Sequence, residues 1–284
     1  MKFITTFACL VFFISSSVSA TEPAKPAAAA TTDAATEVNK VITDFAQNNP
    51  LALWNALPKS YQADINQLVS NFTSIYEKDV YNRLMNLLRR VVTAVKSKRA
   101  IILQMAAKKG PPNKRQEFEK NFDGLIAVLE ALMKSQIMDY DKMRNADVGK
   151  FIGTHGTATF RTAVALSGKN PLTTMLGDLR VKEVSRKGND VMLDEVLNGK
   201  LKGKPEAYVN VEGKWIPKQM MIGWKPGVAM ANAKIAQLRT QSKKQNETMR
   251  KVLPLIEKLL ADFEKIDNEA QLSVFPLQAM MLGQ

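Results

Sequence analysis

The side chains of this sequence that could do chemistry are few: one histidine and two short groups of carboxylates. His155 lies between two glycines in the segment Gly153–Thr157, and the nearest acid before it, Asp147, is eight positions away. A histidine that acts as a general base needs a partner group that positions it. We therefore expect His155 to have a structural role or to lie at the surface.

The first carboxylate group invites comparison with a calcium-binding loop. It consists of Asp139, Asp141 and Asp147, together with Asn145. A twelve-residue calcium loop needs a glycine at its sixth position and a glutamate at its twelfth, and this segment has neither. Lys142 and Arg144 also interrupt the group with positive charge. We interpret the segment as a solvated helix end and predict no metal site.

The second carboxylate group contains Asp190, Asp194 and Glu195. Two carboxylates that face each other across a cleft can hydrolyse a glycosidic bond. An exported hydrolase that works through such a pair is therefore the alternative function. Their spacing does not place them across a cleft, so no residue is assigned a catalytic role.

Other enzyme chemistry is not favoured by the residue types. The only cysteine, Cys9, lies in the N-terminal apolar segment, so the chain after that segment has no thiol nucleophile and no cysteine ligand. The sequence contains neither a Gly-x-Ser-x-Gly elbow nor a Walker-type phosphate loop. We expect no cofactor and favour a non-enzymatic role.

Charge is the strongest functional signal after the N-terminus. The chain has 40 Lys and Arg against 27 Asp and Glu, a formal net charge of +13. No acid occurs between Asp79 and Glu117, and none occurs between Glu212 and Glu247. Such clustering is not typical of a uniform solubilising surface, and it predicts a basic face for an anionic partner.

The first basic segment has the pattern of an amphipathic helix. Leu84, Leu88, Val91 and Val95 fall on one side of it at helical spacing. This pattern suits a helix packed on a core, and it also suits a helix at a membrane surface. Both interpretations stay open, because the apolar stripe can face inward while the cations face a partner. The candidate contact residues are Arg83, Arg89, Arg90, Lys96, Lys98 and Arg99, with Lys243 and Lys244 from the second basic segment.

The partner expected from this pattern is an anionic membrane surface or a cell-envelope polymer. Nucleic acid is disfavoured, because no aromatic residue occurs between Arg83 and Arg115 to stack on bases. A protein partner is a further possibility, since fourteen methionines could form an adaptable apolar surface.

The N-terminus predicts export to the periplasm or the medium. Residues 1–20 resemble a signal peptide, with Lys2 before an apolar run and a small-x-small end that places cleavage between Ala20 and Thr21. Residues 21–36 are rich in Ala, Thr and Pro, which predicts a flexible leader. No later apolar stretch is long enough to span a bilayer, so we expect no integral span after cleavage.

The remaining chain predicts an α+β fold that is predominantly helical. Residues 37–170 have helical periodicity, with Ser60 as an expected N-cap and one helical stretch over Tyr140–Ser167. Residues 171–225 predict a small antiparallel meander of three or four strands. Residues 226–284 predict C-terminal helices that pack on the same domain, and Trp215 and Trp224 are expected to hold the sheet against the helices.

Overall fold

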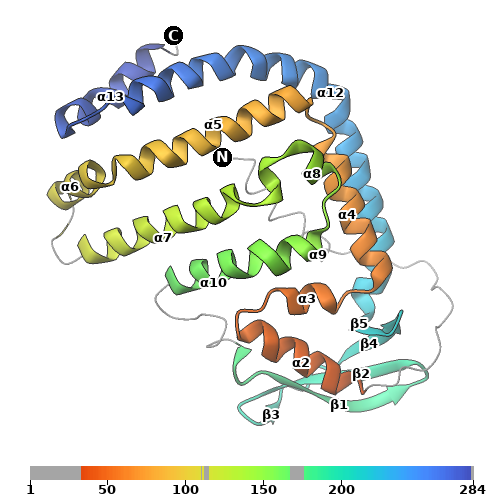
Figure 1. The fold of residues 1–284 in the computed structure, drawn as a ribbon. Coiled ribbons are helices and arrows are strands. Elements are labelled where there is room, and N and C mark those ends of the chain that lie inside the picture. Colours follow the sequence, from red (N-terminus) through yellow and green to blue (C-terminus); the bar gives the residue numbers. More distant parts are fainter. Residues whose placement is uncertain (1–32, 110, 112–114, 167–175, 283–284) are drawn as a thin grey trace.

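The computed structural model describes residues 33–109, 111, 115–166 and 176–282, and it confirms a predominantly helical α+β fold (Figure 1). The elements before the sheet are α2 (Ala34–Ala46), α3 (Leu51–Asn55), α4 (Lys59–Thr73), α5 (Lys78–Ser97), α6 (Arg99–Lys109), α7 (Arg115–Met133), η3 (Gln136–Met138), α8 (Tyr140–Arg144), α9 (Val148–Phe151), η4 (Ile152–Gly156) and α10 (Thr157–Leu166). The strands are β1 (Arg180–Lys187), β2 (Asp190–Leu197), β3 (Lys200–Leu201), β4 (Glu206–Val211) and β5 (Lys214–Pro217). Two helices follow the sheet: α12 (Lys218–Glu264) and α13 (Glu269–Leu282).

The predicted signal peptide, its cleavage site at Ala20 and Thr21, and residues 21–32 of the predicted leader lie outside the described residues. Residues 34–36, which the sequence assigns to a flexible leader, are instead helical, because α2 begins at Ala34. The Asp33 side chain caps this helix by accepting a hydrogen bond from the Thr36 backbone N–H at 2.9 Å. Ala34 is fully buried, so the folded part starts about three residues earlier than the periodicity predicts.

The sheet is an antiparallel meander with one short extra strand. Its strands are ordered β1-β2-β4-β5, and the two-residue β3 pairs with β2. Five strands therefore replace the expected three or four, because a two-residue strand carries no alternation that a sequence could reveal. The turn at Glu212 and Gly213 has φ values of 52° and 79°, which matches the tight hairpin that the sequence predicts there.

The helix after the sheet begins earlier than expected. The sequence places the sheet at 171–225 and marks Trp224–Gly227 as its boundary, whereas the last strand ends at Pro217 and α12 starts at Lys218. Residues 171–175 lie outside the described part. Pro226 and Pro254 both lie inside α12. A proline in a helix costs about 3 kcal/mol, and the burial of Trp224 and Leu253 in α12 offsets that cost.

Helix α12 follows two earlier helices in turn. Its first half runs beside α4, where the Asn71 side chain donates to the Asn232 side chain at 3.0 Å. Its second half runs beside α5 in the same direction, so the long helix follows the corner between α4 and α5 (Figure 1). Asn246 lies buried at this corner, where its amide donates to the Ile75 carbonyl at 3.3 Å and accepts from the Glu77 N–H at 3.4 Å.

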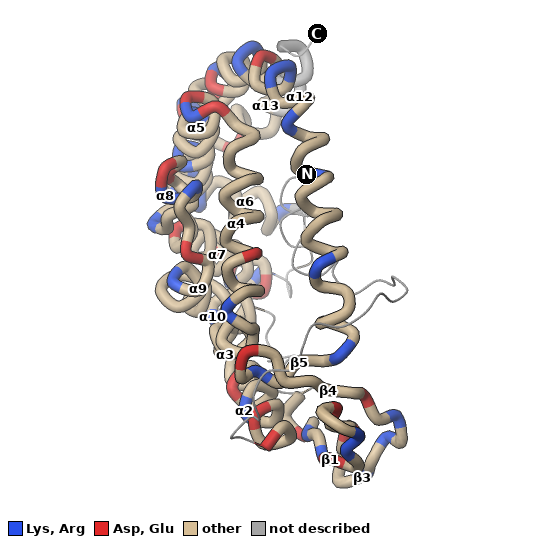
Figure 2. Tube along the Cα trace, turned by 90° about the vertical axis from the view of Figure 1, so that its right-hand side faces the viewer, with Lys and Arg blue, Asp and Glu red and all other residues tan. Residues whose placement is uncertain are grey.

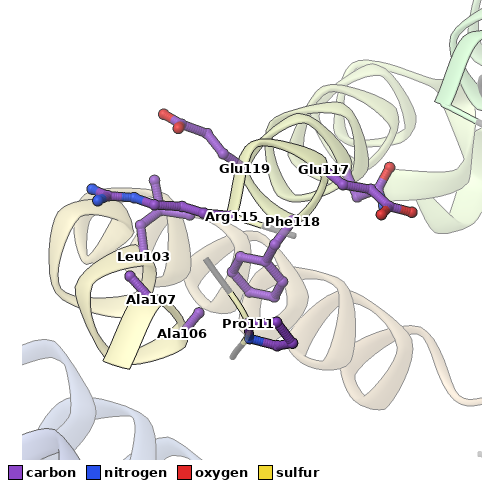
Figure 3. Close-up of a pocket in the computed structure, with 9 residues that line it drawn as sticks. Leu103, Ala106, Ala107, Pro111, Arg115, Glu117, Phe118 and Glu119 are labelled. Atoms are coloured by element: carbon purple, nitrogen blue, oxygen red, sulfur yellow. The ribbon is translucent and has the colours of Figure 1, made fainter. Parts of the chain in front are cut away.

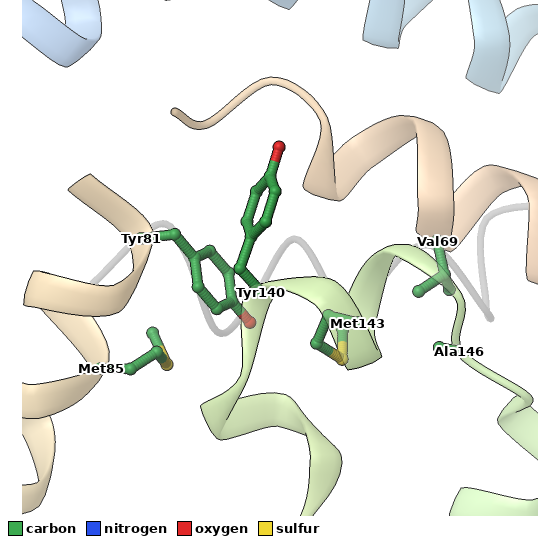
Figure 4. Close-up of a cluster of buried hydrophobic side chains, with 6 residues drawn as sticks. All are labelled: Val69, Tyr81, Met85, Tyr140, Met143 and Ala146. Carbon is green, nitrogen blue, oxygen red and sulfur yellow. The ribbon is translucent and has the colours of Figure 1, made fainter. Parts of the chain in front are cut away.

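The second half of α12, α5, α7 and α10 lie side by side in one layer (Figure 1). Helix α5 uses two sides for this packing: Val80 and Leu87 contact α12, while Tyr81 and Met85 contact α8 in the cluster of Figure 4. Helices α7 and α10 approach closely at Gly124, where an added Cβ would lie 1.7 Å from Leu166 Cδ2. A side chain there would collide with the Leu166 side chain, which would have to move.

Two tryptophans join the sheet to the helices, which confirms their predicted role. Trp215 packs with Ala34 of α2 and with Val191 of the sheet. Trp224 of α12 lies in one buried cluster with Val209 and Ile216 of the sheet. Its ring stacks on Tyr61 of α4 with centroids 4.0 Å apart, and its indole N–H donates to Asp64 at 2.8 Å. The sheet is therefore held at the end of α4 that lies farthest from the corner.

Two local predictions are corrected by capping. The stretch Tyr140–Ser167 is divided into shorter helices, because Asp139 and Asp147 each cap a new helix start. Residue Ser167 lies outside the described part. Ser60 is not the N-cap of α4, since the helix starts at Lys59 after Pro58. The Ser60 N–H instead donates to the Glu212 carboxylate at 3.0 Å, and the hydrogen bonds from Ser60 lower the pKa of Glu212.

Candidate functional site

In the segment that was compared with a calcium loop, Asp139 and Asp147 cap the N-termini of α8 and α9. Asp139 accepts from the Lys142 N–H at 3.0 Å, and Asp147 accepts from the Lys150 N–H at 2.9 Å. Asp141 forms an ion pair with Lys78 at 2.5 Å. Within the described residues, no three His, Cys, Asp or Glu side chains gather closely enough to hold a metal ion.

The carboxylates of β2 do not form a convergent pair. Asp194 is buried and accepts from the Gly203 and Lys204 N–H groups at 2.8 and 3.2 Å, so it anchors the loop after β3. Glu195 points to the opposite face of the strand, as adjacent strand residues do. Asp190 pairs with Lys218 at 2.5 Å, and four residues of strand separate it from Asp194 by about 13 Å. That separation exceeds the carboxyl spacing of glycosidases.

His155 lies in the π-helical turn η4. The Phe151 ring is 6.2 Å from the imidazole, centroid to centroid. No hydrogen bond or ion pair joins His155 to a carboxylate of the described chain. The geometry therefore supplies no partner for general-base chemistry.

Most of the predicted basic contacts on α5 are occupied by carboxylates from neighbouring helices. Arg83 donates two hydrogen bonds to Glu257 of α12, both 2.6 Å long. Seven residues later on each helix, Arg90 donates two hydrogen bonds to Glu264, of 3.1 and 2.7 Å. The hydrogen bonds from Arg83 hold the pKa of Glu257 below its usual value. These arginines connect α5 to α12.

Of the other predicted cations in this region, most form ion pairs with carboxylates and one is exposed to solvent without such a partner among the described residues. Lys96 binds Glu130 of α7 at 2.6 Å, and Arg99 binds Asp123 and Glu119 of the same helix, each at 2.6 Å. Lys98 is buried, with Asp267 at 3.6 Å. Arg89 is exposed and has no carboxylate within 4 Å in the described chain. The predicted residues of α5 and α6 therefore form a network of helix contacts and not one open cationic face.

Lys243 and Lys244 behave differently, and they belong to a larger set. Along α12, seven exposed cations have no carboxylate within 4 Å among the residues that the structure covers. Glu247 is the one unpaired acid near them, since Asp262 pairs with Lys265. Figure 2 shows the blue positions following one another along this helix. Six of these cations lie within about 140° of one another at about 100° per residue, and we call them the basic side of α12: Lys225, Arg239, Lys243, Lys244, Lys251 and Lys258. The seventh, Lys234, lies about half a turn from Lys243.

Sequence reasoning missed most of this set. The prediction relied on the number of arginines in α5. Whether a cation stays unpaired depends instead on whether the neighbouring helices place a carboxylate beside it. One signal was available in the sequence, since Lys244, Lys251 and Lys258 recur every seven residues and so share one side of a helix. Arg239 donates to the Ser74 hydroxyl at 2.6 Å and keeps its charge unpaired.

A small apolar pocket lies between α6 and α7 (Figure 3). Its volume is about 310 Å³, at the lower end of the range for small-molecule sites. Leu103, Ala106 and Phe118 contribute apolar surface, and Arg115 contributes a cation that has no carboxylate within 4 Å in the described residues. Glu117 and Glu119 also line the pocket, and Glu119 pairs with Arg99.

No protein-family model, curated protein or solved structure matches the chain. Among the described residues, no helix is both long enough and apolar enough to cross a membrane.

Proposed function

We propose that the chain is an exported, non-enzymatic protein that binds an anionic lipid surface through the basic side of α12. The observation that carries this proposal is the difference in pairing between the two basic segments. The arginines Arg83, Arg90 and Arg99 are paired with carboxylates, whereas the cations of the basic side of α12 are exposed and have no described carboxylate within 4 Å. Arg250 of the same helix is the exception, since it pairs with Glu77 and Asp79. Unpaired cations on one helix attract an anionic surface, and each contributes about 1 kcal/mol close to it.

Exposed apolar side chains favour lipid over a hydrated polymer. Val252 and Leu255 lie beside Lys251 on α12 and remain 37% and 54% exposed. A helix that combines lysines with such side chains can insert the apolar groups at the headgroup boundary while the lysines contact phosphates. A polysaccharide or other hydrated polymer would leave these groups in water. The hydrolase alternative is not retained, because the carboxylates of β2 are separated and bonded to their own surroundings.

The test is co-sedimentation of the mature chain with vesicles of phosphatidylglycerol or of phosphatidylcholine, at low and at physiological salt. We expect binding only to the anionic vesicles, with weaker binding at the higher salt. Reversing three charges, in the variant Lys243→Glu, Lys244→Glu and Lys251→Glu, should lower the affinity by at least about 100-fold, from roughly 1 kcal/mol per lysine.

The matched control reverses three charges on the sheet, at Lys182, Lys187 and Lys200. These lysines are also exposed and have no described carboxylate within 4 Å, so their surroundings match those of the α12 lysines. Because both variants replace three lysines with glutamates, they change the net charge of the protein equally. We expect less than a threefold effect from this control. An equal loss in both variants would assign binding to net charge alone, and equal binding to both vesicle types would contradict the proposal.

A further inference from the structure

The layer of α12, α5 and α7 has two different surfaces. The ion pairs between these helices lie along one of them. Arg83 joins α5 to Glu257 of α12, and Lys96 joins α5 to Glu130 of α7. Because these pairs connect neighbouring helices on the same surface, residues half a turn away on each helix must lie on the opposite surface.

On α5 the opposite surface is apolar. Val80 and Leu87 face α12, while Tyr81 and Met85 face α8, and the stripe that begins with Leu84 lies between these two contact sides. The stripe continues with Leu88, Val91 and Val95. Leu88 is 37% exposed although it lies in the middle of the helix.

The neighbouring helices continue this surface. On α7, Glu119 and Glu130 point to the α5 and α6 side, and the stripe of Phe118, Phe122 and Leu125 lies about a quarter turn from them, away from the polar side. Phe118 and Leu125 are 42% and 54% exposed. On α12, Val252 and Leu255 occupy the corresponding side. We call the stripes of these three helices the apolar face.

The charges at its borders indicate what covers the apolar face. Contiguous exposed apolar surface in a folded protein marks a binding site. Lys251 and Lys258 border the face along α12, and Arg115 lies at its other border, where Phe118 also lines the pocket between α6 and α7 (Figure 3). An amphiphile with an anionic headgroup satisfies both the cations and the apolar side chains.

We infer that the apolar face binds acyl chains of an anionic phospholipid, so that the protein removes lipid from the bilayer as well as binding its surface. The inference rests on the proposed function, because the basic side of α12 supplies the headgroup contacts. The pocket beside Phe118 receives the end of one chain. Binding buries side chains that otherwise stay in water, at about 25 cal/mol per Å² of apolar area.

The experiment separates extraction from surface binding. The mature chain is incubated with phosphatidylglycerol vesicles, the vesicles are removed by centrifugation at high salt, and phospholipid that remains with the soluble protein is quantified by mass spectrometry. We expect stoichiometric phospholipid with the native chain. The variant Leu88→Gln with Leu125→Gln should retain at least tenfold less lipid and still sediment with vesicles through its lysines.

The control variant Leu53→Gln with Leu201→Gln changes two side chains that are equally exposed, at 46% and 50%, but lie outside the apolar face. It should extract lipid like the native chain. Normal vesicle binding without extracted lipid would overturn this inference and leave the proposed function intact, whereas no vesicle binding would overturn the proposed function itself. A lipid-free dimer in light scattering that Leu88→Gln dissociates would also overturn the inference, since a second copy would then cover the face.

Discussion

The buried amide of Asn246 should be one of the most sensitive polar positions in the molecule. It is 3% exposed and bonds the backbone on both sides of the corner between α4 and α5. In the variant Asn246→Ala, the Ile75 carbonyl and the Glu77 N–H lose these partners in a place with little access to water. A buried group left unsatisfied costs about 1–3 kcal/mol, and both bonds are long, at 3.3 and 3.4 Å. We therefore expect the free energy of unfolding to fall by about 2 kcal/mol.

The assay is urea unfolding followed by far-UV circular dichroism, with thermal unfolding as a second measure. A loss of about 2 kcal/mol corresponds to a decrease in Tm of about 4–8 °C for a chain of this size. Arg239→Ala is the matched control, because Arg239 also bonds the corner from α12 but is exposed, and it should cost under about 0.5 kcal/mol. Asn246→Asp retains the size of the side chain and loses the amide donor to Ile75. If either Asn246 variant is as stable as Arg239→Ala, the corner does not depend on these hydrogen bonds and the reasoning fails.

Three further predictions concern charge, packing and processing. The hydrogen bonds from Arg83 lower the pKa of Glu257 in the folded state below its ordinary value of 4.5, so this pair contributes stability that is present above pH 4.5 and is lost as the pH falls through the folded pKa. Arg83→Ala should therefore make the stability depend less on pH below 4.5, and an unchanged acid unfolding profile would contradict this. Leu253 is fully buried between α12 and α5, so Leu253→Ala should lower the free energy of unfolding by about 2–5 kcal/mol in urea, and a loss under 1 kcal/mol would show that the contact is not tightly packed. In a bacterial host the secreted chain should begin at Thr21 by intact mass, and Ala20→Leu should block that cleavage, whereas a mature chain with residues 1–20 still attached would refute the signal-peptide assignment.

Local signals predicted the fold class because they depend on neighbours in the sequence. The alternation in β1 and the turn at Glu212 and Gly213 both require only a few adjacent residues. The ends of the elements were less predictable where a distant group decides them. In the first turn of α4, the Ser60 N–H donates to the carboxylate of Glu212, which lies more than 150 positions later in the sequence. No pattern near Lys59 could reveal that partner.

The candidate site was harder to predict for the same reason. Arg83 and Arg90 lie at one edge of the α5 stripe, and that edge faces α12. Their partners, Glu257 and Glu264, lie 174 residues away, so the sequence near α5 shows only unbalanced positive charge. Whether a basic segment is free or neutralised depends on which helix the fold places beside it.

The α5 stripe also shows why an amphipathic pattern alone leaves two interpretations open. A helix inside a single layer has a neighbour on each side and two remaining surfaces, so its apolar residues need not all face a core. Val80 packs against α12 and Met85 packs against α8, the two neighbours of α5, and Leu84 packs against both clusters. The continuation to Leu88 is left partly exposed because no described helix covers that surface. The ion pairs on the other surface connect neighbouring helices without using these apolar side chains, and each contributes little stability because it is partly exposed.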